Sequence, residues 1–174
     1  RFMLEHGEAK AFLVDQEFGE LAEAALVGLE RPPLVISIAD PSLQGGKLIS
    51  ALTYDDLLAE GSADAPLQLP EDEWDAITLS YTSGTTGNPK GVVYHHRGAY
   101  LNAVSNALTW NMGEHPVYLW TLPMFHCNGW CFPWTLAVNA GTSVCLRQVR
   151  GDLVFAAIAE HRVSHFCGAP VVLN

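Results

Sequence analysis

Short apolar runs alternate along the chain with amphipathic segments, and this alternation predicts strands and helices in turn. Apolar, β-branched runs predict buried strands, whereas apolar residues three or four positions apart predict helices. The expected strands lie at residues 11–14, 34–38, 76–81, 91–95, 117–122, 142–146 and 163–167. The expected helices lie at residues 1–7, 19–29, 50–58, 97–110, 129–138, 152–161 and from 169 onward. This order is typical of an α/β fold with mixed, largely parallel sheet layers flanked by helices.

Two of the expected helices have a candidate capping residue. Thr53 is one, because Asp55 and Asp56 follow it in what would be the first turn. Asp152 is the other, at the start of the helix at 152–161. A short side chain that accepts hydrogen bonds at these positions satisfies N–H groups that the helix itself leaves without a partner.

The acidic charge of the chain is concentrated in its first part. The 174 residues carry a net charge of −10. Residues 1–75 contain 16 acidic and 4 basic side chains, and residues 76–174 contain 3 acidic and 5 basic ones. Two interpretations explain this asymmetry. Either the first part has an acidic, solvated face and the second part is more buried, or the second part binds an anion. The net charge disfavours a nucleic-acid or anionic-membrane partner. The expected linker lies at residues 59–73.

Cysteine and hydropathy patterns indicate a cytoplasmic protein without a membrane partner. The four cysteines have apolar neighbours, and no second ligand pair follows Cys127 and Cys131 at the spacing of a zinc finger. The longest apolar stretch, near 129–140, contains Pro133 and Asn139 and is too short to span a bilayer. The N-terminal sequence has no signal-peptide pattern.

The chain begins and ends in apolar sequence. Phe2–Leu4 follow the first residue directly, and Val171–Leu173 precede the last. Natural termini are usually polar and frayed. The interpretation is that the chain is a piece of a longer protein.

The segment 81–91, with the sequence YTSGTTGNPKG, carries the clearest chemical signal. Its glycines let the backbone approach an anion, and successive N–H groups form a nest for phosphate oxygens. Hydroxyl groups add donors, and Lys90 adds a positive charge that can follow a triphosphate. A Walker A loop is excluded, because Pro89 precedes the lysine and Gly91 follows it where a hydroxyl is required. The alternative is an ordinary polar turn of a β-hairpin.

This segment resembles the AMP-binding signature of the adenylate-forming enzymes, which include acyl-CoA synthetases, luciferases and the adenylation domains of peptide synthetases. Residues 122–134, LPMFHCNGWCFPW, resemble the next motif in the form found in medium-chain, aryl or methylthiopropionate-type CoA ligases. Weaker patterns between 140 and 170 follow in the expected order. The resemblance covers essentially the whole chain and implies part of the N-terminal domain of an acyl-CoA synthetase-like fold, with 1–75 and 76–174 as segments of one domain.

The resemblance implies an AMP-forming acid–thiol ligase of fatty acid metabolism. Such an enzyme joins a carboxylic acid to ATP as an acyl-adenylate, with Mg²⁺, and then transfers the acyl group to coenzyme A. The family's later Mg²⁺-binding Glu, ribose-binding Asp, hinge and C-terminal domain lie outside this chain. We therefore expect a fragment that is inactive without the remainder of the parent chain, and the resemblance leaves a homodimer open.

The matching positions also imply roles for individual residues. The β- and γ-phosphates of ATP would be held by Thr82, Ser83, Gly84, Thr85, Thr86 and Gly87, with Lys90 balancing their charge and Thr82 as a Mg²⁺ ligand. His126 would lie beside the α-phosphate and the acyl carboxylate, and its alternative is a core histidine. The acyl and CoA pocket would include Asn128, Gly129, Trp130, Gly168 and Ala169.

Other residues keep open interpretations. Trp130 and Trp134 are explained equally by helix packing, and this Trp-rich segment indicates a compact pocket for short, branched, thioether or aryl acids. His95 and His96 are expected to have structural roles beside the loop. For the chain as a whole, the alternatives are a nucleotide-binding module without catalysis and a structural domain in which 81–91 is only a turn. Neither alternative explains two ordered motifs.

Overall fold

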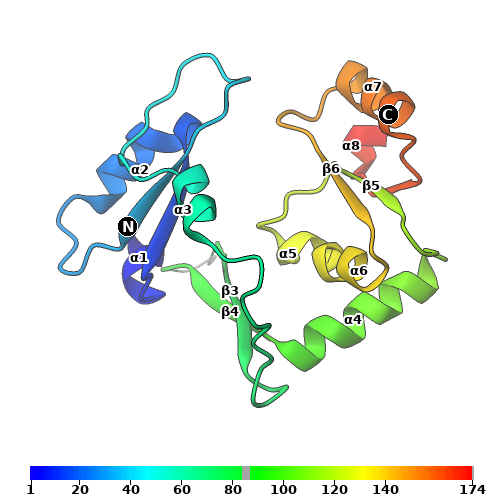
Figure 1. Ribbon diagram of the computed structural model, residues 1–174, viewed down its shortest axis with the longest axis horizontal. Coiled ribbons are helices and arrows are strands. Elements are labelled where there is room, and N and C mark those ends of the chain that lie inside the picture. The colour runs from blue at the N-terminus through cyan, green and yellow to red at the C-terminus, as the bar shows by residue number, and fades with distance from the viewer. Residues whose placement is uncertain (84–86, 174) are drawn as a thin grey trace. The chain divides into compact units, whose positions relative to one another are not determined.

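A computed structural model describes residues 1–83 and 87–173. The chain divides into two compact units, residues 1–69 and residues 70 onward, and the division falls inside the expected linker at 59–73. Each unit has strands flanked by helices (Figure 1). The first unit has a parallel strand pair and the second has both parallel and antiparallel pairs, so the expected mixed α/β class is confirmed. None of the helices formed by the described residues is long and apolar enough to cross a membrane.

The first unit is built on two parallel strands joined through a helix. Strand β1 pairs with β2 in the register Ala11↔Leu34 to Asp15↔Ile38. A single 3₁₀ turn, η1, leads from β1 into α2, and α3 closes the unit behind Thr53, the expected cap. The elements of this unit are α1 (Phe2–His6), β1 (Ala11–Asp15), η1 (Gln16–Phe18), α2 (Gly19–Leu26), β2 (Leu34–Ile38) and α3 (Tyr54–Glu60).

Buried polar side chains hold the loop that follows β2. Ser37 is 1% exposed, and its Oγ accepts hydrogen bonds from the backbone N–H groups of Ile49 (3.2 Å) and Ser50 (3.0 Å). Gln16 donates from Nε2 to the carbonyl of Gly45 at 3.0 Å. These bonds give backbone groups of an irregular segment the partners that a sheet would otherwise supply.

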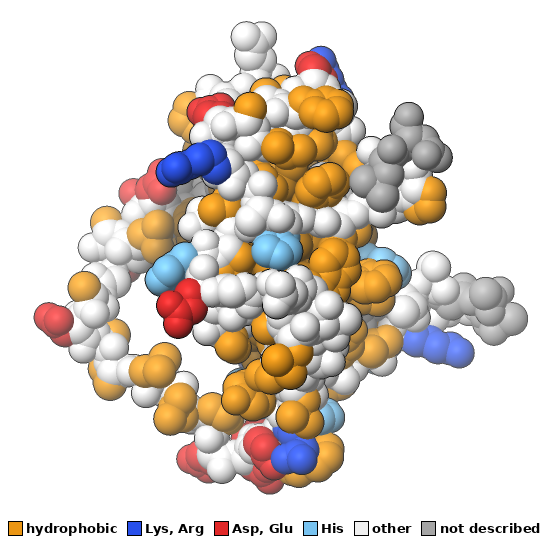
Figure 2. Space-filling model, turned by 90° about the vertical axis from the view of Figure 1, so that its right-hand side faces the viewer, with side chains coloured by type: hydrophobic (Ala, Val, Ile, Leu, Met, Phe, Trp, Pro, Cys, Tyr) orange, Lys and Arg blue, Asp and Glu red, His pale blue; other side chains and the backbone are white. Residues whose placement is uncertain are grey.

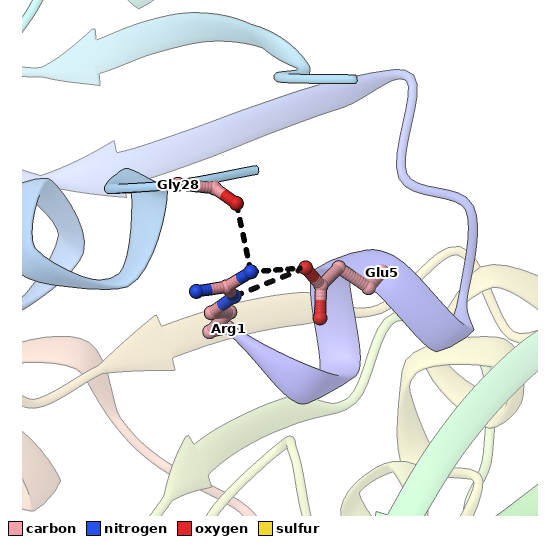
Figure 3. A network of polar contacts seen from close by, with 3 residues as sticks. All are labelled: Arg1, Glu5 and Gly28. Carbon is pink, nitrogen blue, oxygen red and sulfur yellow. Dashed lines mark hydrogen bonds and ion pairs between the residues drawn. The ribbon is translucent and has the colours of Figure 1, made fainter. Parts of the chain in front are cut away.

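An exposed arginine joins α1 to the turn after α2. Arg1 donates from Nε and Nη2 to the same carboxylate oxygen of Glu5, each at 3.0 Å, and from Nη2 to the carbonyl of Gly28 at 2.7 Å (Figure 3). Ion pairs this exposed contribute little to stability, about 0–1 kcal/mol. The contact therefore orients α1 more than it stabilises the unit.

The second unit combines an antiparallel hairpin with a three-stranded parallel sheet. Strands β3 and β4 form the hairpin, and β5 lies between β6 and β7, parallel to both. Its elements are β3 (Ala76–Thr82), β4 (Lys90–His95), α4 (His96–Thr109), β5 (Val117–Trp120), α5 (Cys127–Trp130), α6 (Phe132–Val138), β6 (Thr142–Cys145), α7 (Gly151–His161), β7 (His165–Phe166) and α8 (Pro170–Leu173).

Aromatic side chains of the central strand β5 and helix α6 form the core of this unit. The ring centroids of Tyr118 and Phe132 are 4.7 Å apart in a stacked pair, and Trp120 meets Tyr118 edge-on at 5.0 Å. Met112 and Leu136 complete the buried cluster. Part of the surface of this unit is also apolar, since Phe125, Trp130 and Phe155 are exposed. Figure 2 shows many hydrophobic side chains on one face of the molecule. The scarcity of charge after residue 75 therefore does not reflect burial alone.

The helix expected at 129–138 is interrupted in the structure. Residues 127–130 form a separate short turn, α5, and α6 begins only at Phe132. Pro133 accounts for the new start, because proline has no N–H to donate and is accommodated in the first turn of a helix. Cys131, with φ of 63°, lies in the left-handed region between the two. The prediction of one continuous helix was wrong.

The predicted cap of the helix at 152–161 was also wrong. Helix α7 begins at Gly151, the N-cap is Arg150, and Asp152 lies inside the first turn. The Asp152 carboxylate accepts from Arg150, with Nη2 and Oδ2 2.7 Å apart, instead of from the helix backbone. An acidic side chain in the first turn is still favourable, because it faces the positive end of the helix dipole.

Candidate functional site

The glycine- and hydroxyl-rich segment connects the two strands of the hairpin. Thr82, the last residue of β3, pairs with Lys90, the first residue of β4. The side chains of Thr82, Ser83 and Lys90 are exposed at this end of the hairpin, as is Gly87. Gly84, Thr85 and Thr86, which are expected to hold phosphates, lie outside the described residues. The hairpin therefore brings two hydroxyls and a cation to the two ends of one loop.

Gly87 has a conformation that favours glycine. Its φ is 144°, which side-chain-bearing residues rarely adopt, although a Cβ at this position would meet no atom of residues 1–83 or 87–173 within 4 Å. The constraint at residue 87 is therefore the backbone conformation and not crowding. Space around a backbone of this kind is what an approaching ligand needs.

The opposite end of the hairpin is held firmly by contacts at its base. The His96 N–H donates to the carbonyl of Asp75 at 3.1 Å, and the Arg97 N–H donates to the carbonyl of Glu73 at 2.8 Å. Arg97 also forms an ion pair with Glu73, with Nη1 and Oε1 2.7 Å apart. The ring of His95 lies 4.7 Å from that of Trp74. The register of the two strands is thus fixed where β4 passes into α4.

His95 has a structural role, but at the base of the hairpin and not beside the loop as the sequence predicted. It is the N-cap of α4, and its Nδ1 accepts a hydrogen bond from the N–H of Gly98 at 3.0 Å. A side-chain acceptor at this position satisfies one of the free N–H groups of the first turn. The ring is therefore engaged in holding the helix.

His126 lies in the loop between β5 and α5, and its side chain is exposed. Its backbone N–H donates to the carbonyl of Pro123 at 3.2 Å, and its own carbonyl accepts from the N–H of Gly129 at 3.0 Å. The imidazole is therefore not part of the core, which was the alternative interpretation. The residue stands at the start of an unusual turn.

That turn is left-handed. The five consecutive residues from Cys127 to Cys131 have φ between 48° and 63°. For residues with a side chain, this conformation costs about 1–2 kcal/mol each relative to a right-handed turn. Strain of this kind persists only where surrounding contacts fix the backbone.

Gly129 provides one of these contacts. It is buried, with φ of 56°, and a Cβ built on it would lie 2.6 Å from Cζ3 of Trp120 and 3.0 Å from Cη2. Trp120 is itself 4% exposed in the core. The glycine in this motif is therefore explained by close packing against β5.

Asn128 provides a second contact, which reaches the hairpin. Its Nδ2 donates to Oγ1 of Thr78 at 3.0 Å, and its Oδ1 accepts from Oγ of Ser80 at 3.3 Å. Both hydroxyls belong to β3, two residues apart and therefore on one face of the strand. Both ends of the Asn128 amide are thus occupied by the strand that leads to Thr82.

Trp130 has an exposed ring and an engaged backbone. The residue is 59% exposed, so its side chain contributes little to the packing of the helices. The carbonyl of Trp130 accepts from Nδ2 of Asn106 in α4 at 2.8 Å. A third contact therefore holds the left-handed turn while leaving the indole at the surface.

A small cavity lies between the hairpin and this turn. Its volume is about 260 Å³, and its lining residues come from β4, α4 and the turn: Val93, Tyr94, His95, Gly98, Ala99, Asn102 and Cys131. Burial raises the pKa of Tyr94, and the neighbouring Cys127 and Cys131 raise it further by charge repulsion. The Tyr94 hydroxyl is therefore neutral at physiological pH and can donate a hydrogen bond.

The loops after β5 and β7 meet at one edge of the parallel sheet. The Thr121 hydroxyl, directly after β5, donates to the carbonyl of Cys167, directly after β7. Gly168 is half-buried beside this bond, and Ala169 is exposed. In parallel sheets, ligands bind outside the carboxyl ends of the strands. The expected pocket residues Gly168 and Ala169 thus belong to the same sheet edge as the loop that contains His126.

Thr82 is the expected Mg²⁺ ligand. Among residues 1–83 and 87–173, no group of three or more His, Cys, Asp or Glu side chains could hold a metal ion. A threonine hydroxyl is outside that set of residue types. The assignment of Thr82 to Mg²⁺ therefore stays a prediction.

A sequence profile of the family described as AMP-binding enzyme matches residues 1–174, the whole chain. The chain belongs to this family. The resemblance to AMP-binding enzymes that the two motifs indicated is thereby confirmed. The resemblance to acyl-CoA ligases is confirmed by two curated relatives.

Two curated relatives and one solved structure illustrate the similarity. An acetate/butyrate–CoA ligase of Arabidopsis thaliana, named as peroxisomal, is 54% identical over 99% of this chain and 32% of its own length. An acetate–CoA ligase of Humulus lupulus is 49% identical over 99% of this chain and 33% of its own. The inhibitor-bound N-terminal domain of FACL13 from Mycobacterium tuberculosis superposes with a TM-score of 0.77 at 26% identity, covering 99% of this chain and 41% of that one.

The chain spans about a third of the length of the curated relatives it matches. One of these relatives is named as peroxisomal. The cytoplasmic location inferred from the sequence therefore stays a prediction. The solved relative is an N-terminal domain, which agrees with the expected fold.

Sequence reasoning missed the residues that hold this family member's motifs together. Thr78 and Ser80 are hydroxyls at alternate positions of a strand, a pattern that predicts a shared polar face, although it does not predict their partner. Asn106 and Trp120 have no local signal at all, because their roles depend on contacts with a segment 9–24 residues away.

Proposed function

We propose that this chain is the phosphate-binding part of an AMP-forming acyl-CoA ligase that activates a short-chain carboxylic acid. The observation that carries the proposal is the hairpin, whose register sets Thr82 opposite Lys90 across the loop of the AMP-binding signature. Family membership over residues 1–174 supports the nucleotide, and the names of the two curated relatives support acetate or a similarly small acid.

The proposed reaction has two steps. The carboxylate of the acid attacks the α-phosphorus of ATP, and pyrophosphate leaves with the electron pair of the broken bond. The thiol of coenzyme A then loses its proton, attacks the acyl carbonyl and displaces AMP. Both steps bring anions together, so the protein must supply positive charge and N–H or O–H donors at the phosphates.

The hairpin end supplies such groups. The exposed hydroxyls of Thr82 and Ser83 are donors for phosphate oxygens, and the Lys90 ammonium neutralises charge on the leaving pyrophosphate. The remaining donors are assigned to Gly84, Thr85, Thr86 and Gly87 by the match to the family motif. Mg²⁺ takes oxygen ligands, so the Thr82 hydroxyl fits that ion, which when bound neutralises phosphate charge.

The exposed imidazole of His126 is proposed to contact the reacting groups. Its loop follows the carboxyl end of β5, where Thr121 is bonded to the segment that precedes Gly168 and Ala169. With Asn128, Gly129 and Trp130 in the next turn, these residues are proposed to form one wall of the acyl and CoA pocket. The chain alone is proposed to be inactive, because it spans a third of its relatives.

The test is acid-dependent exchange of labelled pyrophosphate into ATP by the full-length protein. We expect exchange with acetate, and a loss of about 100-fold or more in the Lys90→Ala variant, since the phosphates lose a cation that acts in the transition state. Lys10→Ala, which removes an exposed lysine of the first unit, is the matched control and should leave exchange unchanged.

Three results would contradict the proposal or a part of it. Tight ATP binding with no exchange for any short, branched or aryl acid would favour a nucleotide-binding module without catalysis. Unchanged ATP binding in Lys90→Ala would mean that the loop is only a turn. Exchange by residues 1–174 alone would overturn the claim that this part is inactive.

A further inference from the structure

The left-handed turn at 127–131 must be held by contacts from outside itself. Four of its five residues carry side chains, and each contributes about 1–2 kcal/mol of strain in this conformation. Three contacts oppose the strain: Gly129 against Trp120, the Trp130 carbonyl bonded to Asn106, and Asn128 bonded to β3. Of these, the first two hold the turn to the core and to α4. The third joins it to the hairpin.

The third contact links two segments that carry predicted site residues, because Asn128 lies in the turn and is bonded to β3. Asn128 is two residues after His126 in the chain, and Ser80 is two residues before Thr82. Its amide is bonded at both ends, to Thr78 at 3.0 Å and to Ser80 at 3.3 Å. One side chain therefore spans from the turn that carries the histidine to the strand that carries the phosphate-binding hydroxyls.

We propose that Asn128 is a positioning residue, which fixes His126 relative to the phosphate-binding end of the hairpin through its bonds to Thr78 and Ser80. In this role the amide acts through its bonds to β3, one from Nδ2 and one to Oδ1. This inference rests on the proposed function, in which His126 acts beside the phosphates that the hairpin holds.

The expected consequence is a selective loss of turnover. Binding of ATP uses groups on the hairpin itself, so its KM should change less than about threefold when the link is removed. Adenylation requires both segments in one geometry, and a misplacement of about 1 Å lowers kcat by up to about 100-fold. A loss of kcat at constant KM marks an interaction that matters only in the transition state.

Asn128→Gly is the variant that removes the side chain without adding backbone strain, because glycine accepts the φ of 48° at this position. Thr78→Val removes the partner hydroxyl at nearly constant volume, and Thr78→Ser retains it. Asn139→Ala is the matched control, since Nδ2 of Asn139 donates to the carbonyl of Thr135 within its own helix end, at 2.9 Å.

The experiment compares these variants of the full-length protein in two measurements. The first is kcat and KM for ATP in acetate-dependent pyrophosphate exchange. The second, which needs no activity, is amide hydrogen exchange in the peptide covering 122–134. We expect Asn128→Gly and Thr78→Val to lower kcat about 10–100-fold and to speed hydrogen exchange in this peptide. Thr78→Ser and Asn139→Ala should resemble the wild type in both.

The outcomes separate the two proposals. Unchanged hydrogen exchange in Asn128→Gly would overturn the positioning role whatever the activity is. Faster hydrogen exchange with an unchanged kcat in an active enzyme would overturn it as well.

A wild-type protein without acid-dependent pyrophosphate exchange would refute the proposed function. The hydrogen-exchange comparison would then refute or support the link between Asn128 and β3 by itself. Equal losses in Asn128→Gly and in Asn139→Ala would also count against it.

Discussion

Gly129 lies so close to Trp120 that a Cβ at residue 129 would stand 2.6 Å from ring carbon Cζ3. The glycine is also buried at φ of 56°, where any side chain adds strain. The packing of the left-handed turn against β5 therefore depends on the absence of a single methyl group.

We expect Gly129→Ala to lower the free energy of unfolding by about 1–3 kcal/mol, because the Trp120 ring or the turn must move. Urea denaturation of the wild type and the variant measures this difference. Gly151→Ala is the control: nothing lies within 4 Å of a Cβ there, and alanine is favourable at the start of α7. A variant at 129 as stable as the one at 151 would contradict the close packing.

Ser37→Ala should destabilise the first unit, because the N–H groups of Ile49 and Ser50 would lose their acceptor at partly buried positions. A buried donor left without a partner costs about 1–3 kcal/mol. Chemical denaturation provides the measurement, and Ser62→Ala is the matched control, since that serine accepts one backbone N–H at an exposed position. Similar effects of the two substitutions would argue against the role of Ser37.

The capping box of α3 should make stability depend on pH in acid. Hydrogen bonds from Thr53 hold the pKa of Asp56 below its ordinary value of 3.8. A group with a lower pKa in the folded state contributes stability above its unfolded-state pKa. That contribution is lost as the pH falls through the lower, folded-state value.

Thr53→Ala tests this relation. Loss of the N-cap should lower stability by about 1 kcal/mol near neutral pH, and the difference from the wild type should shrink as the pH falls below 3.8. Unfolding measured from pH 6 down to about pH 2.5 gives the profile. Thr53→Ser keeps the hydroxyl and should follow the wild type, whereas a pH-independent difference between wild type and Thr53→Ala would rule out the coupling to Asp56.

The cysteines should differ in their rates of alkylation. Cys131 is 3% exposed, and burial raises the pKa of Cys167, which lowers its reactive thiolate fraction near pH 8. We expect iodoacetamide to modify the exposed Cys127 first and these two at least about tenfold more slowly, as followed by mass spectrometry. In guanidinium chloride all should react at similar rates. Rapid labelling of Cys131 in the folded chain would show that the turn opens.

Sequence reasoning predicted the elements that local chemistry determines. The strand at Leu34–Ile38, the Thr53 cap and the end of α1 at Gly7 all follow from residues within one turn of the feature itself. The strands on either side of the glycine-rich segment and the identity of the family, which two motifs indicated, also followed from local sequence. In each of these places the local preference and the final structure agree.

The left-handed turn could not be predicted in this way. Its sequence, CNGWC, contains one glycine, and its apolar spacing is compatible with the continuous helix that we expected. The decisive contacts come from Thr78, Trp120 and Asn106, which no pattern within the motif reveals. Tertiary contacts here override the local preference for a right-handed helix. The same is true of Asn128, whose pocket role stays a prediction while its bonds to β3 are observed.

The hairpin is clamped at its base, where Arg97 pairs with Glu73 and the His95 ring lies against Trp74. A shift of the strands by one residue would turn every side chain of β4 to the opposite face, and these base contacts oppose it. The register of the two strands is thus held at the base of the hairpin. Because the strands are held at the base, we expect substitutions between Thr82 and Lys90 to change ligand preference before they prevent folding.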